Sequence, residues 1–370
     1  MLLCLPCLFC CLVAAQEPPA AKVPDVAQRA QDAWNQGHLE EAAKLYRQAV
    51  RLRPRWAEGW GYLASTLYQL ERYSEARDAY RQTTVLTPKN AASWAYLGLC
   101  DYELHDYPGA FENLAKAQQL GTDDDRDLTA QVKYHLAILC DTAGQFEAGL
   151  KEITWFAQQN LGSPEILEVI GLSVLRMPVF PEKLPEAQRA MVLLAGQASF
   201  AANTQKLDLA QTYYDQLVAQ YPAQPNVHYS YGLFVSYRDL DAALKEYEKE
   251  VEVNPSSAVA RVQAAFLYLK MGQQEKALRD AQEAARLDPR NPSAHNLAGR
   301  ALLELNRPKE AIPELALATR LAPGSASFHL NLARAYQKAG NKTLAAKEIA
   351  TFNLLESKKP QTAGPQQRIQ

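Results

Sequence analysis

Apolar residues recur every three or four positions along most of the chain, which predicts a succession of amphipathic helices. Residues 292–325 show this pattern clearly in two consecutive stripes. The first stripe consists of Ala294, Leu297, Ala298, Ala301, Leu302 and Leu305, and the second of Ala311, Leu315, Ala318 and Leu321. No sustained apolar–polar alternation lies between turn clusters, so the pattern predicts an all-α protein.

The helical pattern repeats with a fixed period of 34 residues. Gly272 and Asn306 hold the same position between the two stripes of successive copies. The other repeated positions are Ala277 and Ala311, Ala284 and Ala318, and Pro289 and Pro323. Such a period is typical of helix–turn–helix units that bury their apolar faces only by stacking on their neighbours.

Small residues and prolines explain how each unit is built. Ala298, Gly299 and Ala311 allow two helix backbones to approach closely, where a larger side chain would overpack. Pro323 ends the second helix, because the residue before a proline is disfavoured in the α region.

Two further copies resemble the tetratricopeptide repeat family. Residues 57–90 carry the family signature at Trp60, Leu63, Ala64, Leu67, Ala76, Tyr80 and Pro88. Residues 91–124 carry it at Trp94, Leu97, Gly98, Ala110, Leu114 and Ala117, and depart from it at Asp101 and Thr122. The resemblance implies a right-handed superhelical solenoid of about nine to ten hairpins. It also implies that the first helices line a concave groove for an extended peptide or a partner helix.

The chain divides into six predicted segments. These are a signal peptide at 1–15, a Pro-rich linker at 16–24, an N-terminal repeat array at 25–176, a Pro-rich seam at 177–186, a C-terminal array at 187–357 and a disordered tail at 358–370. Pro178, Pro181 and Pro185 interrupt the helical period in the seam, which is therefore a candidate boundary or hinge.

Residues 1–15 are apolar, carry no charge and are too short to span a bilayer. With small residues at Val13 and Ala15 they predict a cleaved signal peptide, and hence an exported protein, periplasmic or secreted. A positively charged start is missing. Cys4, Cys7, Cys10 and Cys11 resemble a lipoprotein signal only loosely.

Composition and motifs give no indication of catalysis. The net charge of −2 argues against a broad nucleic-acid surface, and no nucleophile, metal-protease or phosphate-loop motif is present. We therefore expect no enzymatic activity and no cofactor. His228, His295 and His329 occupy the position of Trp60 and Trp94 in later copies, too far apart for a shared metal, and are predicted to pack.

Other isolated groups have structural interpretations. Cys100 and Cys140 are predicted to be buried free thiols, with a disulfide as the alternative. The acidic run 123–127 is predicted to start a helix rather than to form a calcium loop, since it lacks the loop's glycine and closing glutamate.

Two sets of residues fall on the positions that line the groove in the family. The aromatic set is Trp34, Tyr68 and Tyr102, each 34 positions apart, with Tyr134 as an extension. Rings of this kind bind with a large contact area and little loss of rotamer entropy, which suits an extended apolar or Pro-rich segment. The alternative is that they pack against the next hairpin.

The second set lies in the C-terminal array and consists of Asn296, Arg300, Arg334 and Gln337. It indicates an acidic or carboxylate-bearing partner segment by charge complementarity, with a solvated surface as the alternative. The predicted function is a non-catalytic protein–protein interaction scaffold that binds a partner segment in the groove. A carbohydrate or cell-wall binding protein and an accessory subunit of an export or assembly complex remain alternatives.

Overall fold

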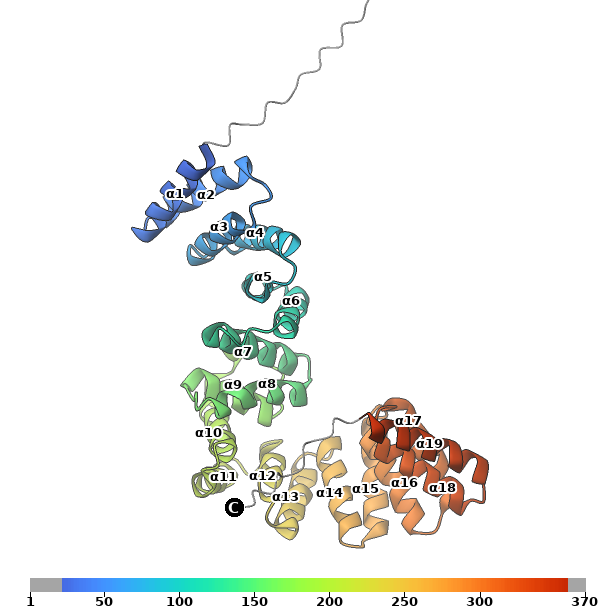
Figure 1. Cartoon of the computed structure of the whole chain (residues 1–370). Coiled ribbons are helices and arrows are strands. Elements are labelled where there is room, and N and C mark those ends of the chain that lie inside the picture. The colour runs from blue at the N-terminus through green and yellow to red at the C-terminus, as the bar shows by residue number, and fades with distance from the viewer. Residues whose placement is uncertain (1–21, 359–370) are drawn as a thin grey trace, which may run out of the picture. The chain divides into compact units, whose positions relative to one another are not determined.

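The computed structural model describes residues 22–358, and these residues form nineteen α-helices, one short 3₁₀ helix and no strand (Figure 1). The chain divides into two compact units near the end of α8. The N-terminal unit ends at Phe156 and the C-terminal unit begins at Ala157. The predicted signal peptide 1–15, most of the linker and all but the first residue of the tail lie outside the described residues.

The N-terminal unit is built from seven helices and all but the last two residues of an eighth. They are α1 (Lys22–Asn35), α2 (Leu39–Leu52), α3 (Ala57–Gln69), α4 (Tyr73–Leu86), α5 (Ala91–Glu103), α6 (Tyr107–Leu120), α7 (Arg126–Thr142) and α8 (Phe146–Gln158). Helix α1 thus begins inside the segment that the sequence predicts as linker.

The C-terminal unit contains the remaining helices. They are α9 (Pro164–Val174), the 3₁₀ helix η1 (Pro181–Lys183), α10 (Glu186–Asn203), α11 (Leu207–Gln220), α12 (Val227–Val235), α13 (Leu240–Val253), α14 (Ala258–Lys270), α15 (Gln274–Leu287), α16 (Pro292–Glu304), α17 (Pro308–Leu321), α18 (Ala326–Lys338) and α19 (Lys342–Ser357).

Consecutive helices pair into hairpins, and each hairpin packs on the next within its unit. Eighteen of the described helices form nine hairpins, and α9 is the helix without a partner of its own. The predicted all-α solenoid of about nine to ten hairpins is confirmed for the described residues.

The turn inside most hairpins contains one residue with left-handed backbone. Two series with the 34-residue period show it: Gly37, Glu71 and His105 in one unit, and Gly272, Asn306 and Gly340 in the other. This conformation costs an ordinary L-residue about 1–2 kcal/mol, which explains why glycine and asparagine recur at this position.

Small residues set the distance between the helices of a hairpin, as predicted. Ala298 and Ala311 are completely buried. A Cβ atom on Gly299 would lie 2.4 Å from Cγ of Leu315, so only glycine fits where α16 crosses α17.

The Pro-rich seam at 177–186 lies within the C-terminal unit, between α9 and α10, and holds η1. It therefore occupies the place of a second helix. Helix α9 packs on α10 instead, through Gly171 and Gly196, where added Cβ atoms would lie 1.9 Å from the carbonyl oxygens of Val192 and Leu167. The units themselves divide about twenty residues earlier in the chain, after Phe156.

Candidate partner-binding surfaces

The predicted aromatic set lies on the first helices of the N-terminal unit and keeps part of its surface accessible. Trp34 on α1 is 38% exposed. Tyr68 on α3, Tyr102 on α5 and Tyr134 on α7 are half-buried. None of the four is sealed inside the core.

Tyr68 and Tyr102 are held by neighbouring aromatic rings. The Tyr68 ring contacts Tyr73 and Tyr96 edge-on, with ring centroids 5.5 Å apart in both pairs. Burial raises the pKa of Tyr68 above its ordinary value of about 10, so the ring is uncharged at neutral pH. Because its neighbours fix its orientation, it has little rotamer freedom left to lose on binding.

The Tyr102 ring is also held by two rings, of which Tyr107 is the equivalent of Tyr73 one repeat later. It lies edge-on against Tyr107, with ring centroids 5.7 Å apart, and against His135, at 4.6 Å. His135 in turn contacts Tyr134, at 5.3 Å. The structure therefore joins Tyr102 and Tyr134 through one histidine, and Tyr68 and Tyr102 both pack against one buried apolar cluster.

A second aromatic series, not predicted from the sequence, joins successive hairpins. Tyr46 stacks on Tyr62, and Tyr80 stacks on Tyr96, each with centroids 5.5 Å apart. Both partners recur after 34 residues, so the same spacing argument could have found them. Aromatic residues spaced 34 apart thus serve in two ways in this protein. These rings pack between successive hairpins, whereas Trp34 remains accessible to solvent.

In the polar set of the C-terminal unit, one side chain is buried in a hydrogen bond and the other three are at least partly accessible to solvent. Asn296 is buried, and its Oδ1 accepts a hydrogen bond of 2.9 Å from Nδ2 of Asn331 in the next hairpin. Arg334 and Gln337 are exposed and Arg300 is half-buried. Within residues 22–358 neither arginine forms an ion pair, so both guanidinium groups are available.

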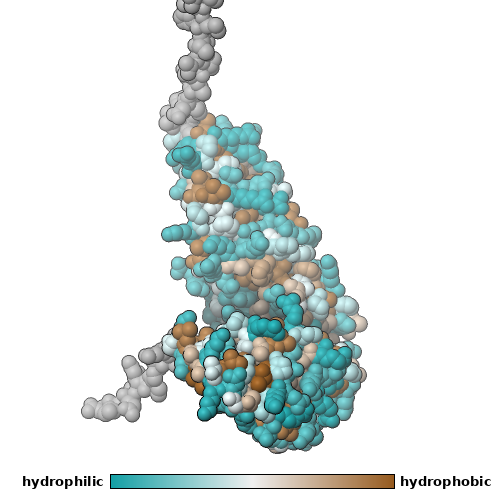
Figure 2. Space-filling model, turned by 90° about the vertical axis from the view of Figure 1, so that its right-hand side faces the viewer, coloured by the Kyte–Doolittle hydropathy of each residue, from teal (hydrophilic) through white to brown (hydrophobic). Residues whose placement is uncertain are grey.

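The space-filling view shows one face of the molecule, on which hydrophilic residues predominate and hydrophobic residues form small separate patches (Figure 2). The exposed large hydrophobic side chains are correspondingly spread along the sequence, from Trp34 to Leu354. This face shows no continuous apolar strip.

The tryptophans of the repeat signature fasten the start of a hairpin to the loop before it. Nε1 of Trp60 donates to the carbonyl oxygen of Pro54, and Nε1 of Trp94 donates to that of Pro88, both at 2.9 Å. These donors pair with backbone carbonyl groups of the loops that follow α2 and α4.

Histidines perform the same task in the C-terminal unit and pack within their hairpins, as predicted. In three copies a histidine Nε2 lies near a proline carbonyl oxygen, and Nδ1 lies near a glutamate carboxylate of the following helix. The copies are Pro222, His228 and Glu246; Pro289, His295 and Glu314; and Pro323, His329 and Glu348. At this position of the repeat, tryptophan and histidine both contact the carbonyl oxygen of the preceding proline.

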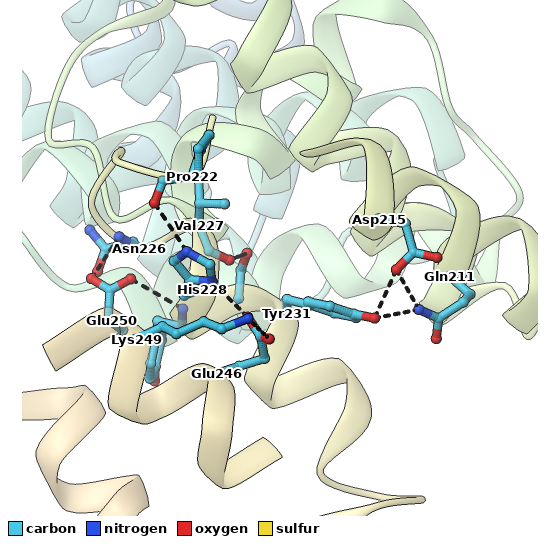
Figure 3. Close-up of polar contacts among 12 residues, drawn as sticks. Gln211, Asp215, Pro222, Asn226, Val227, His228, Tyr231, Glu246, Lys249 and Glu250 are labelled. Atoms are coloured by element: carbon cyan, nitrogen blue, oxygen red, sulfur yellow. Dashed lines mark hydrogen bonds and ion pairs between the residues drawn. The ribbon is translucent and has the colours of Figure 1, made fainter. Parts of the chain in front are cut away.

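His228 shows the arrangement in detail (Figure 3). Its Nδ1 is 2.6 Å from Oε2 of Glu246, whose Oε1 accepts a 2.8 Å hydrogen bond from Lys249. Burial by itself would raise the pKa of Glu246, but the hydrogen bonds and charges of His228 and Lys249 outweigh burial and lower it.

This lowered pKa predicts a pH dependence. A carboxyl group with a lower pKa in the folded state than in the unfolded state stabilises the fold above the unfolded value of 4.5, and that stabilisation is lost as the pH falls through the folded value. We therefore expect wild type to lose more stability than Glu246→Gln when the pH is lowered below 4.5. Urea unfolding at several pH values measures this difference, and parallel curves for the two proteins would contradict it.

The remaining candidate groups are structural. Cys100 and Cys140 are buried free thiols, and burial raises their pKa to about 12 and about 11, so neither is a thiolate at neutral pH. Asp125 caps α7, because its side chain accepts a hydrogen bond from the backbone N–H of Leu128 at 2.9 Å. The acidic run therefore starts a helix, as predicted.

Residues 22–358 contain no cluster of three or more histidine, cysteine or acidic side chains that could hold a metal ion. None of the helices in this part of the chain is both long and apolar enough to cross a membrane.

A known family of repeats matches some of the hairpins. The family model described as tetratricopeptide repeat matches residues 28–91, 63–125 and 262–326. Residues 28–125 and 262–326 thus match tetratricopeptide repeats, and the family model covers less than half of the chain. Such repeats generally mediate protein–protein interactions and are typically non-catalytic. No curated protein matches the chain at a significant level.

Several solved structures resemble part of the chain. The crystal structure of YrrB, titled a TPR protein with an unusual peptide-binding site, is 19% identical, with 44% of this chain and 84% of that chain covered and a TM-score of 0.40. MamA from Desulfovibrio magneticus RS-1 is 18% identical, with 46% and 97% covered and a TM-score of 0.42. A further crystal structure of MamA is 17% identical, with 47% and 95% covered and a TM-score of 0.42.

Proposed function

We propose that this chain is a non-catalytic scaffold that binds a segment of a partner protein along its first helices. The observation that carries the proposal is the pair Tyr68 and Tyr102, which repeat after 34 residues, are half-buried and are fixed by aromatic neighbours. Rigid rings with accessible surface provide binding energy at low entropic cost. An extended apolar or Pro-rich segment suits such a row.

Arg300 and Arg334 support a second contact region in the C-terminal unit, for acidic side chains of the partner. Both are free of ion pairs within the described residues, and guanidinium groups pair with carboxylates in a planar, bidentate geometry. Asn296 does not contribute directly in this proposal, since Asn331 already occupies its oxygen. Gln337 is exposed and remains a candidate contact.

Removing the Tyr102 ring tests the aromatic contact. We expect Tyr102→Ala to weaken binding to Pro-rich and apolar peptides on an array by about tenfold, as for a typical aromatic anchor. Tyr102→Phe keeps the ring and should bind like wild type.

The controls separate binding from folding. Circular dichroism must show that Tyr102→Ala remains folded, because the ring also contacts His135. Equal peptide binding by wild type and Tyr102→Ala would refute the aromatic contact. Weak binding of oligosaccharides instead of peptides, lost in Trp34→Ala and Tyr68→Ala, would support the carbohydrate-binding alternative.

A further inference from the structure

A hollow of about 600 Å³ in the C-terminal unit brings four arginines together. Arg261 comes from α14, Arg279 and Arg286 come from α15, and Arg307 lies directly before α17. Most of the lining belongs to α15, a second helix of its hairpin. The hollow is thus distinct from the first-helix positions of Arg300 and Arg334.

Three of the four arginines are exposed to solvent and form either weak ion pairs or none within the described residues. Arg286 pairs with Glu283, and Arg307 pairs with Glu310, in exposed pairs three residues apart on one helix turn. Such surface pairs contribute only about 0–1 kcal/mol, so a ligand can replace them at little cost. Arg279 is exposed and forms no ion pair with any residue of the described range.

Arg261 has a structural role, because its guanidinium group is already bound to other residues of the protein. Its side chain is only 15% exposed, and its Nη1 donates to Oδ1 of Asp280 at 3.1 Å. It also donates to the carbonyl oxygen of Pro255, at 3.3 and 3.4 Å. This guanidinium takes the position that Trp60 and the histidines hold in other repeats, so it is not free for a ligand.

The other lining residues determine the kind of ligand. Glu275 and Glu283 are the only carboxylates among them, against four guanidinium groups. Leu305, which is half-buried, supplies most of the apolar surface, since Leu278 is only 8% exposed. A volume of this size falls in the range of ligand sites and exceeds what a single small anion fills.

We propose that this hollow binds an acidic peptide segment, whose carboxylates pair with Arg279, Arg286 and Arg307 while one apolar side chain lies on Leu278 and Leu305. Guanidinium groups bind carboxylates through two parallel hydrogen bonds, which favours a segment with several glutamates or aspartates. The lining carries four arginines against two glutamates, and Asp280 and Glu310 pair with Arg261 and Arg307 from beside it, so the complementarity rests on Arg279 and on the exposed pairs that a ligand can replace.

Fluorescence anisotropy with the full chain tests the proposal. The probe is a labelled Glu-rich peptide containing one leucine, and its control is the same peptide with glutamine at every glutamate. We expect wild type to bind the acidic probe and not the control. The double variant Arg279→Gln/Arg307→Gln should bind at least tenfold more weakly, whereas Glu310→Gln, which releases Arg307, should bind severalfold more tightly.

Matched variants distinguish this site from the proposed first-helix site. Arg290→Gln removes an exposed arginine of the same unit that does not line the hollow, and should bind like wild type. A loss confined to Arg334→Gln would overturn the hollow while supporting the proposed function. Equal losses in Arg290→Gln and the double variant, or no binding by wild type, would also overturn the proposal.

Discussion

Replacing Gly171 by alanine is expected to lower the free energy of unfolding of the C-terminal unit by about 3 kcal/mol. The new methyl group would lie 1.9 Å from the carbonyl oxygen of Val192, which is a backbone atom of α10 and cannot rotate away. Helices α9 and α10 would have to separate and lose packing along their whole contact. The shift in the urea midpoint, followed by circular dichroism, measures the effect.

Two further variants make this prediction specific. Gly196→Ala meets the carbonyl oxygen of Leu167 at the same crossing, so the double variant should cost less than the two single variants combined. At Gly324 an added Cβ atom meets nothing within 4 Å, so Gly324→Ala should change stability by no more than about 0.5 kcal/mol. Equal effects at Gly171 and Gly324 would contradict the proposed close contact.

Replacing Glu250 by alanine is expected to lower the free energy of unfolding by about 3 kcal/mol. The buried carboxylate of this α13 residue caps the start of a different helix, α12. The side chain of Glu250 accepts hydrogen bonds from the backbone N–H groups of Asn226, at 2.8 Å, and Tyr229, at 3.2 Å (Figure 3). Alanine would leave both N–H groups at the start of α12 without this acceptor. Urea unfolding measures the loss.

The glutamine variant separates hydrogen bonding from charge. Glu250→Gln keeps one acceptor oxygen and should cost less than half as much as Glu250→Ala. Burial raises the pKa of Glu250 even though three hydrogen bonds oppose that change. A raised carboxyl pKa makes the folded state hold its proton more tightly, so this contribution to stability falls as the pH rises above 4.5 and should be absent in Glu250→Gln. An alanine variant as stable as wild type would show that the cap is dispensable.

The sequence predicted the local features of this protein with some accuracy, because they depend on residues near one another in the chain. The three- and four-residue spacing of apolar positions defined the helices, and the 34-residue period defined the hairpins. Gly299 and Ala311 were recognised as a close crossing because a helix crossing leaves no space for large side chains.

The candidate sites depend on contacts that the period alone does not define. Asn296 occupied a predicted groove position, yet its oxygen is used by Asn331, a residue of the next hairpin. Tyr68 and Tyr102 recur at one position of the repeat, but whether a ring packs or remains accessible depends on neighbours such as Tyr96 and His135.

By itself the sequence determined the helical class, the repeated hairpin and the small residues that allow two helices to approach. The tertiary structure alone decided that α9 packs on α10 in place of a second helix, that Glu250 caps α12, and that Arg279 and Arg307 meet in one hollow. The reason is that periodicity reports which face of a helix is buried, whereas a site requires side chains of different helices to converge.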